Sequence, residues 1–246
     1  AEGVDICEKT KVTRVEARGK AGVRVHVEAP DGPAVIDGTH LLVAAGRAVN
    51  VDGLDLDKAG IVHDRRGIKV SDKLRTSNRR VYAIGDVAGG LQFTHVAGYH
   101  AGLVLRPLLF RLPARANDGI IPWVTYTDPE LAHVGLTEDA ARERHGRISV
   151  LRWPYAENDR AQAEHRTEVL IKVVTGRKGR ILGATIAGAH AGEMINLWAL
   201  ALSKGMTVRE LAAGVGRRLG GRGAVGARGP DLRENQTSGA PRHRRP

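Results

Sequence analysis

The chain has 246 residues, a formal net charge of +11 and 42% hydrophobic residues, which is enough for about two ordinary domains. No apolar stretch approaches the roughly 18 residues of a membrane span, and residues 1–20 lack the apolar segment of a signal peptide. A single cysteine, Cys7, excludes an internal disulfide and fits the reducing environment of the cytoplasm.

The first 47 residues predict a series of short strands. Residues 11–17 and 23–29 alternate apolar and polar side chains, so we expect them to pair as a hairpin. Residues 41–45 are continuously apolar, which is typical of a strand buried on both faces. Residues 47–68 then indicate loops.

The stretch TSNRRVYAIGDVAGG, residues 76–90, places an acid at the end of an apolar strand. Residues 81–84 predict this buried strand, which ends at Gly85 and Asp86 and enters a glycine-rich turn. In an open sheet covered by helices, ligands bind at the carboxyl ends of the strands. Asp86 is therefore a candidate binding residue. The alternative is a Gly-Asp turn that only ends a strand.

A helix is predicted over residues 94–111, where apolar residues recur at helical spacing. Thr94 is the expected N-cap, and Pro107 is expected to kink the helix or to end its first part. Residues 111–123 contain two prolines and an Asn-Asp-Gly turn signal, and we interpret them as a linker between domains.

The residues from Ile120 onward mix strands and helices in an α+β pattern. The predicted strands are residues 123–127, 148–155, 167–174 and 181–188, and the predicted helices are residues 137–146 and 191–204. Thr137 begins a capping signature, and Gly205 is typical of the residue after a helix. The later helix is apolar on more than one face, Trp198 included, which predicts self-association. Burial of this helix within its own domain is the alternative.

From residue 214 the composition changes abruptly. The last 33 residues hold eight arginines and eight glycines, no aromatic residue, and a net charge of +6 out of +11. Such a segment cannot bury a core and is predicted to be disordered. An arginine-rich arm for nucleic acid would explain the charge, but residues for base stacking are scarce and we expect no nucleic-acid partner. We expect an out-of-frame translation, because codons for Gly, Arg, Ala and Pro are rich in G and C.

Five stretches carry a family resemblance over roughly residues 1–213. They are LLVAAGRAVNVDGLDLDKAGI, TSNRRVYAIGDVAGGLQFTHVAGYHAG, IPWVTYTDPELAHVGLTEDAA, NDRAQAEHRTEVLIKVV and ILGATIAGAHAGEMINLWALAL. In this order they resemble the carboxyl-terminal half of the pyridine nucleotide-disulfide oxidoreductase family, which includes dihydrolipoamide dehydrogenase and mercuric reductase. The resemblance implies FAD and NAD(P) as cofactors and a homodimer as the assembly.

The implied fold is α/β plus α+β: the end of a two-dinucleotide-binding flavoprotein fold, then an α+β dimerisation domain and a disordered basic tail. Residues 1–47 would be a remnant of the NAD(P)-binding domain, and residues 48–119 part of the FAD-binding domain. Residues 120–213 would be the dimerisation (interface) domain, and residues 214–246 the Gly/Arg-rich tail.

The resemblance assigns Asp86 to the ribityl chain of FAD. A carboxylate suits this role because it only accepts hydrogen bonds, and sugar-alcohol hydroxyl groups donate them. Gly85 would let the cofactor approach without a side chain in the way.

The start of the predicted helix would meet the flavin ring with its backbone. Its matching residues are Gln92, Phe93, Thr94 and His95. Free amide groups and the positive end of the helix dipole favour the negative charge of a reduced flavin. On its own, His95 reads as a capping or surface histidine.

Gly46 and Val12 match family positions that contact the nicotinamide nucleotide, although alone they read as an ordinary turn glycine and an ordinary strand residue. Other family motifs do not occur in residues 1–213: the G-x-G-x-x-G turns, the Cys-x-x-x-x-Cys pair and the His-Pro-Thr or Tyr-Pro-Thr motif. Cys7, without a partner, is predicted to be a buried and inert thiol.

These features predict a fragment of an FAD-dependent, NAD(P)-linked oxidoreductase subunit that is not active alone and has no catalytic acid-base residue of its own. In the intact family, hydride passes from NAD(P)H to FAD and then to a disulfide, a thiol-bound metal or another acceptor. The alternative is a noncatalytic dimerisation and scaffold module.

Overall fold

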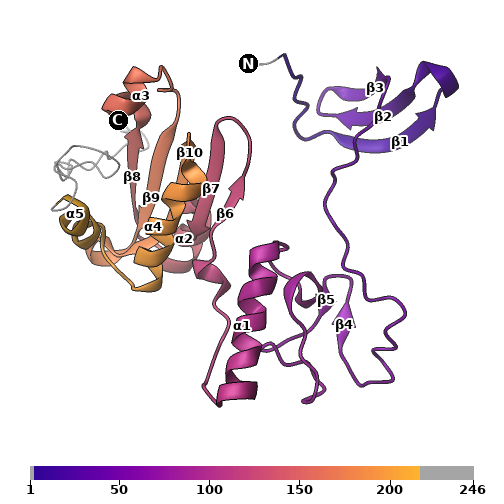
Figure 1. Cartoon of the computed structure of the whole chain (residues 1–246). Helices are drawn as coiled ribbons and strands as arrows, with labels where there is room; N and C mark the ends of the chain where they lie inside the picture. The colour runs from indigo at the N-terminus through magenta and orange to yellow at the C-terminus, as the bar shows by residue number, and fades with distance from the viewer. Residues whose placement is uncertain (1–2, 217–246) are drawn as a thin grey trace, which may run out of the picture. The chain divides into compact units, whose positions relative to one another are not determined.

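The structure of the chain is a computed structural model that describes residues 3–216 (Figure 1). The chain divides into two units, one ending at Val49 and one beginning at Asn50. The predicted tail lies outside the described residues from residue 217 onward. Its first three residues, 214–216, were placed wrongly, because they form the end of helix α5, Val208–Gly216.

The first unit is a three-stranded antiparallel sheet in the order β1-β2-β3. Its strands are β1 (Lys11–Ala17), β2 (Val23–Ala29) and β3 (Gly32–Gly38). The predicted hairpin is confirmed, because β1 pairs with β2 across the short 3-10 helix η1, Gly19–Ala21.

The buried strand predicted at residues 41–45 is absent. This segment has no strand assignment, and the exposed fractions of Leu42 and Val43 are 88% and 76%. A strand buried on both faces needs hydrogen-bonding neighbours and covering side chains. No described segment pairs with these residues, so the apolar run stays exposed.

The second unit begins with a loop-rich region around a small core of Leu56, Ile61, Ile68 and Ala83. It contains two short paired strands, β4 (His63–Asp64) and β5 (Gly67–Ile68). The strand predicted at residues 81–84 is wrong, because only Tyr82 pairs, in an isolated bridge with Arg75. As at residues 41–45, no described strand lies beside it to complete a sheet.

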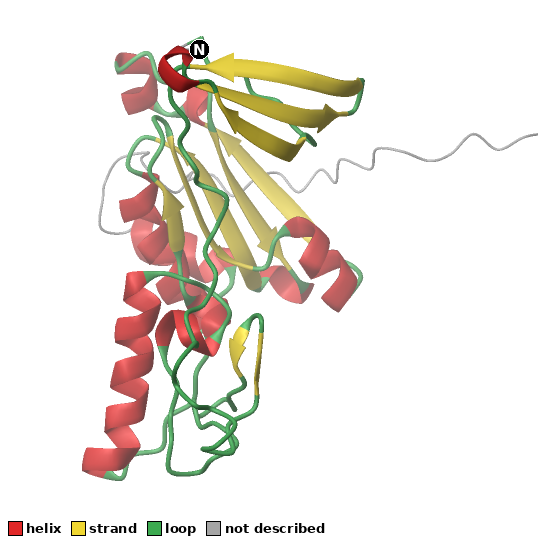
Figure 2. Cartoon of the chain, turned by 90° about the vertical axis from the view of Figure 1, so that its right-hand side faces the viewer, coloured by secondary structure: helices red, strands yellow, loops and turns green. Residues whose placement is uncertain are grey.

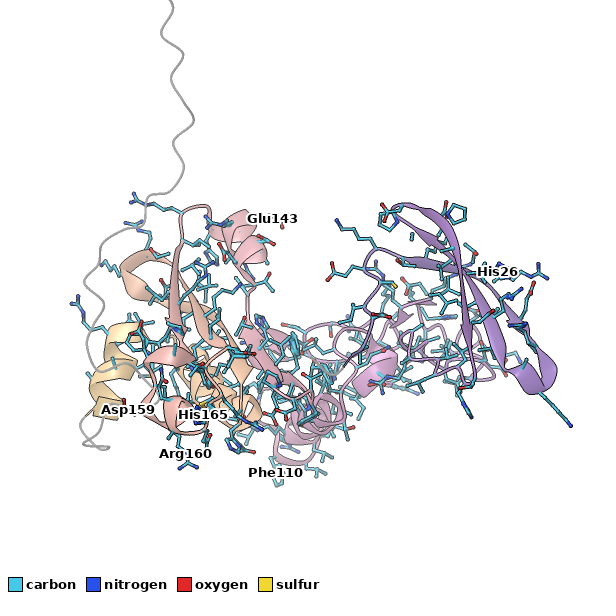
Figure 3. The ribbon with its side chains drawn as sticks, turned by 90° about the horizontal axis from the view of Figure 1, so that it is seen from above. His26, Phe110, Glu143, Asp159, Arg160 and His165 are labelled. Atoms are coloured by element: carbon cyan, nitrogen blue, oxygen red, sulfur yellow. The ribbon has the colours of Figure 1, made fainter. Side chains whose placement is uncertain are left out.

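Helix α1, Thr94–Phe110, confirms the predicted helix but corrects its details. Phe93 is the N-cap, and no side chain caps the helix, so the predicted capping role of Thr94 is wrong. Pro107 lies inside the helix, which continues to the exposed Phe110 (Figure 3). Val96 and His100 form its buried face, with exposed fractions of 1% and 3%.

The rest of the second unit is a five-stranded antiparallel sheet in the order β6-β7-β10-β9-β8 (Figures 1 and 2). Its strands are β6 (Trp123–Thr125), β7 (Glu130–Gly135), β8 (Ser149–Pro154), β9 (Leu170–Thr175) and β10 (Ile181–Gly188). Its helices include α2 (Glu138–His145) and α4 (Ala191–Ser203). The four predicted strands and both predicted helices are confirmed, whereas β7, the short α3 (Asp159–Ala163) and α5 were not predicted.

The core of this region lies between α4 and strands β7 and β10. Trp198 belongs to it, with 7% of its surface exposed, so the wide apolar face of α4 is used largely within its own domain. The alternative interpretation of this helix therefore holds for Trp198. Self-association has to rest on other grounds.

Candidate functional site

The Gly85–Asp86 turn forms the start of a 3-10 helix, η2, Gly85–Ala88, packed against α1. Gly85 has a φ of +66°, and a Cβ atom there would lie 2.9 Å from the Cβ of Ala97 in α1. Both conditions exclude a larger residue, since L-residues rarely adopt such a φ and no room is left beside the helix. Glycine at this position is thus required by the packing of the turn itself.

A buried histidine holds this turn in place. The Nδ1 atom of His100 accepts a hydrogen bond of 3.2 Å from the amide of Gly85. Its Nε2 atom lies 3.4 Å from Oδ1 of Asp118, in the segment that leads into the five-stranded sheet. Sequence reasoning missed His100, although its place four residues after Val96 on the buried face of a predicted helix was an available signal.

The four residues expected to contact the flavin ring lie together where α1 begins. Gln92 and Phe93 are half-buried just before the helix, and Thr94 and His95 are exposed in its first turn. Asp86 is half-buried in the first turn of η2, which contacts α1. The structure therefore brings a carboxylate and the amino-terminal end of a 17-residue helix into one neighbourhood. Such a helix end favours negative charge.

The side chain of His95 links α1 to the next domain. Its Nε2 atom lies 2.9 Å from the carbonyl oxygen of Pro122, and its ring stacks on that of Phe93 with a centroid distance of 5.3 Å. Because a carbonyl oxygen only accepts, Nε2 donates in this contact. His95 is thus neither a helix cap nor a free surface histidine.

Val12 and Gly46, the residues expected to contact NAD(P), belong to the first unit. Val12 is 57% exposed on β1, where it pairs with Val27. Gly46 is exposed with a φ of +94°, and nothing lies within 4 Å of the Cβ it lacks. Its backbone conformation therefore explains the glycine, and no described contact joins these two residues into a site.

Cys7 corrects another expectation, because it is exposed and not buried. Within residues 3–216, no group of histidine, cysteine, aspartate and glutamate side chains is arranged to hold a metal ion. None of the helices in the described part of the chain combines the length and apolar character that a bilayer span requires.

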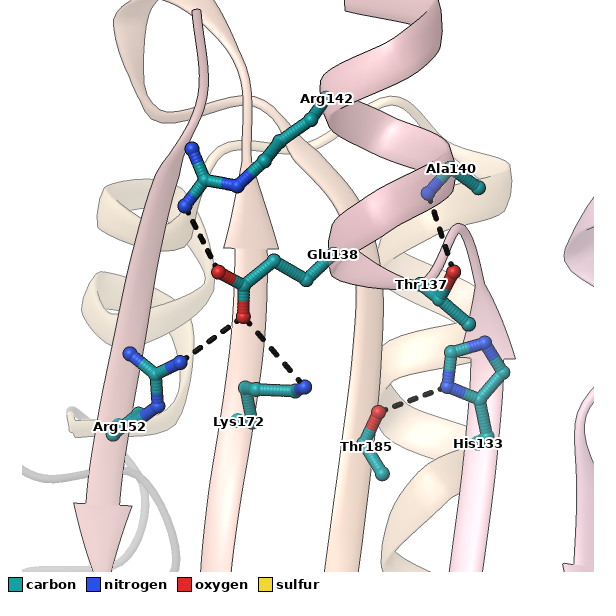
Figure 4. Close-up of polar contacts among 8 residues, drawn as sticks. All are labelled: His133, Thr137, Glu138, Ala140, Arg142, Arg152, Lys172 and Thr185. Atoms are coloured by element: carbon teal, nitrogen blue, oxygen red, sulfur yellow. Dashed lines mark hydrogen bonds and ion pairs between the residues drawn. The ribbon is translucent and has the colours of Figure 1, made fainter. Parts of the chain in front are cut away.

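A cluster of opposite charges lies on α2 and the sheet (Figure 4). Glu138 accepts hydrogen bonds of 2.9 Å from Arg142 and 3.0 Å from Arg152, and Lys172 lies 3.8 Å away. The hydrogen bond from Arg142 and the surrounding cations lower the pKa of the Glu138 carboxyl. This cluster joins α2 to β8 and β9, which is a structural function.

His133 is the buried histidine of the same sheet. It contacts Oγ1 of Thr185 through Nδ1 at 2.9 Å and the carbonyl of Gly135 through Nε2 at 3.1 Å. Burial lowers the pKa of His133, and the nearby Lys172 acts in the same direction. Both ring nitrogens are occupied within the domain, so His133 is a structural residue.

Two family models match the chain. The model described as pyridine nucleotide-disulphide oxidoreductase matches residues 1–101, and its dimerisation domain matches residues 121–217. A mercuric reductase of Staphylococcus aureus is 33% identical over 212 residues, which are 85% of this chain and 39% of the relative. A dihydrolipoyl dehydrogenase of Bacillus subtilis is 37% identical over 193 residues, 78% of this chain and 41% of the relative.

Two solved structures are similar as well. The HOCl-induced flavoprotein disulfide reductase RclA from Escherichia coli has a TM-score of 0.69 and 30% identity, covering 82% of this chain and 46% of that one. LpdA from Mycobacterium tuberculosis has a TM-score of 0.74 and 26% identity, covering 83% and 44%. The chain thus spans less than half the length of these four proteins.

Proposed function

This chain belongs to the pyridine nucleotide-disulphide oxidoreductase family, and from that premise we propose that it is part of an FAD-dependent, NAD(P)-linked oxidoreductase subunit. It contributes the Gly85–Asp86 turn, the start of α1 and a dimerisation domain. With one cysteine in its sequence, it does not reduce a disulfide through a cysteine pair of its own. Bound FAD would accept the hydride that NAD(P)H donates.

The observation that carries this proposal is the packing of η2 against α1. The carboxylate of Asp86 suits the hydroxyl groups of a ribityl chain, because an ionised acid only accepts hydrogen bonds. The first amide groups of α1 have no partners within the helix and favour an anionic ring edge nearby. The residues present therefore fit the ribityl chain and the flavin ring of FAD.

FAD titration of the purified chain tests the proposal. We expect Asp86→Ala to weaken FAD binding by about 1 to 3 kcal/mol, because hydroxyl groups lose their acceptor in a partly desolvated site. Asp57→Ala is the matched control, since its side chain is 96% exposed in the same unit. Equal affinities for the parent chain and Asp86→Ala would refute the assigned role.

The dimerisation domain supports a second function, a noncatalytic module that brings two subunits together. Its match covers residues 121–217, and its core closes within this region. We propose a homodimer. Sedimentation should show a dimer of the folded chain at about tens of micromolar, a concentration suited to a micromolar dissociation constant. A colourless stable dimer that binds no FAD would favour this module over the oxidoreductase subunit.

A further inference from the structure

Three side chains of α1 bind the segment that leads into the dimerisation domain. His95 donates from Nε2 to the carbonyl of Pro122 at 2.9 Å. Tyr99 accepts a hydrogen bond of 3.1 Å from the amide of Asn117. His100 lies 3.4 Å from Asp118. Helix α1 is thereby fixed to residues 117–122 through contacts that begin in its first turn.

His100 differs from the other two because it also contacts the Gly85–Asp86 turn. The Gly85 amide only donates and the Asp118 carboxylate only accepts, so both contacts are made together by one tautomer, with the proton on Nε2. His100 is 3% exposed. If its side chain were removed, water would not readily replace it as the acceptor for the buried Gly85 amide.

The turn has little room to move independently of this histidine. A Cβ atom added at Gly85 would lie 2.9 Å from the Cβ of Ala97, and one added at Gly90 would lie 3.7 Å from Oδ2 of Asp118. Asp118 therefore lies near the loop after η2 as well as beside His100. In a packed region without slack, a shift of one element displaces its neighbours.

We propose that His100 is a positioning residue of the flavin site, which sets the Gly85–Asp86 peptide and transmits to it the position of residues 117–122. This inference rests on the proposed binding of FAD at Asp86. The tautomer of His100, held by Asp118, keeps Nδ1 available to the Gly85 amide. Affinity for FAD then depends on a carboxylate that belongs to the connection between the two domains.

FAD titration of four variants of the full chain tests this assignment. We expect about a tenfold loss of affinity in His100→Leu, the size of one ordinary hydrogen bond, and about a threefold loss in Asp118→Ala. His100→Asn should restore part of the affinity, because its amide oxygen can take the place of Nδ1. Tyr99→Phe is the matched control, since the Tyr99 hydroxyl group accepts from the Asn117 amide in the linker and, in the described part of the chain, makes no hydrogen bond with Gly85.

The contrary result is equal loss in Tyr99→Phe and His100→Leu, or no loss in His100→Leu and Asp118→Ala. Either would reduce His100 to general packing between helix and linker. If His100→Leu does not fold, Asp118→Ala decides, because the Asp118 side chain is 48% exposed and tolerates replacement.

Nuclear magnetic resonance of the chain without FAD separates this inference from the proposed function. We expect the Gly85 and Asp86 amide signals to shift in His100→Leu and Asp118→Ala, to stay in place in Tyr99→Phe, and the His100 ring to carry its proton on Nε2. A parent chain that binds no FAD refutes the proposed function, and these amide signals still test the positioning of the Gly85–Asp86 peptide by His100. Unchanged Gly85 signals in His100→Leu would overturn it.

Discussion

The first 49 residues and the dimerisation domain are both built from antiparallel strands, yet their apolar side chains have opposite fates. In the first unit, Val27 is the buried hydrophobic residue among those described, while Val35, Leu42 and Val43 are exposed. In the dimerisation domain, a contiguous cluster forms where α4 covers β7 and β10. A sheet builds a core only where a second layer covers its apolar face.

The largest effect is expected at the centre of that covered sheet. Ile186→Ala should lower the free energy of unfolding of the dimerisation domain by about 2 to 5 kcal/mol, because its side chain is fully buried and leaves a cavity. All three tryptophans, Trp123, Trp153 and Trp198, lie in this domain, so denaturant unfolding followed by tryptophan emission reports on it.

Leu42→Ala is the counterpart in the first unit, where 88% of the surface of Leu42 is exposed. We expect a change within about 0.5 kcal/mol, measured as the hydrogen exchange of β1, β2 and β3. A large loss of protection there would mean that residues 41–45 are buried in solution, and the contrast between the two regions would fail.

The next effect concerns the loop-rich region at the start of the second unit. Gly85→Ala should destabilise the turn by about 2 to 3 kcal/mol, because it combines an unfavourable φ with a steric conflict at Ala97. Gly60→Ala is the matched control, with a φ of +68° and nothing within 4 Å of the added Cβ. It should cost about 1 kcal/mol from the backbone alone.

Hydrogen exchange of residues 61–100 measures both glycine variants. Equal effects would show that the turn moves away from α1 at no cost. In that case the packing argument for Gly85 would be wrong. The turn could then move independently of α1, and the positioning role proposed for His100 would be weakened.

A smaller effect is expected from the charge cluster that joins α2 to the sheet. At about pH 7, Glu138→Gln should lower the free energy of unfolding by about 1 kcal/mol, as expected for a partly exposed ionic network. Because the folded-state pKa of Glu138 lies below its ordinary value of 4.5, its contribution is present above that value. The contribution is lost as the pH falls through the lowered folded-state pKa.

The difference between the parent chain and Glu138→Gln should therefore shrink in acid, where the protonated carboxyl resembles the amide. Denaturant unfolding at several pH values, followed by tryptophan emission, measures this difference. Glu143→Gln is the matched control, because Glu143 is exposed on the same helix (Figure 3) and no described ion pair joins it to the cluster; its effect on stability should stay within about 0.5 kcal/mol. A difference that persists unchanged in acid would show that the charge of Glu138 is not its source.

The elements predicted correctly are those whose signal is local. The hairpin of residues 11–29, the helix beginning at Thr94 and the strands of the dimerisation domain each follow from the periodicity of their own residues. The strands predicted at residues 41–45 and 81–84 are not formed. Burial of a strand depends on neighbouring strands, and an apolar run does not indicate whether such neighbours are present.

The candidate site divides in the same way. The positive φ of Gly85 agrees with the turn expected from the Gly-Asp pair. The helical spacing from Val96 indicates that His100 is buried, but its role could not be predicted, because it arises from Gly85 and Asp118, which are 15 and 18 residues away in sequence. The flavin contacts of Asp86 and of residues 92–95 came from the family resemblance, and they stay predictions.

A small effect distinguishes a helix end that is specified locally from one that is specified by packing. Thr137 caps α2 by accepting a hydrogen bond of 3.4 Å from the amide of Ala140, so Thr137→Ala should cost about 0.5 to 1 kcal/mol. Thr94 was predicted to act alike, but α1 begins after Phe93 without a side-chain cap. Thr94→Ala should therefore leave stability unchanged. Thermal unfolding followed by circular dichroism measures both variants, and a matching loss in Thr94→Ala would show that the hydroxyl group caps α1 in solution.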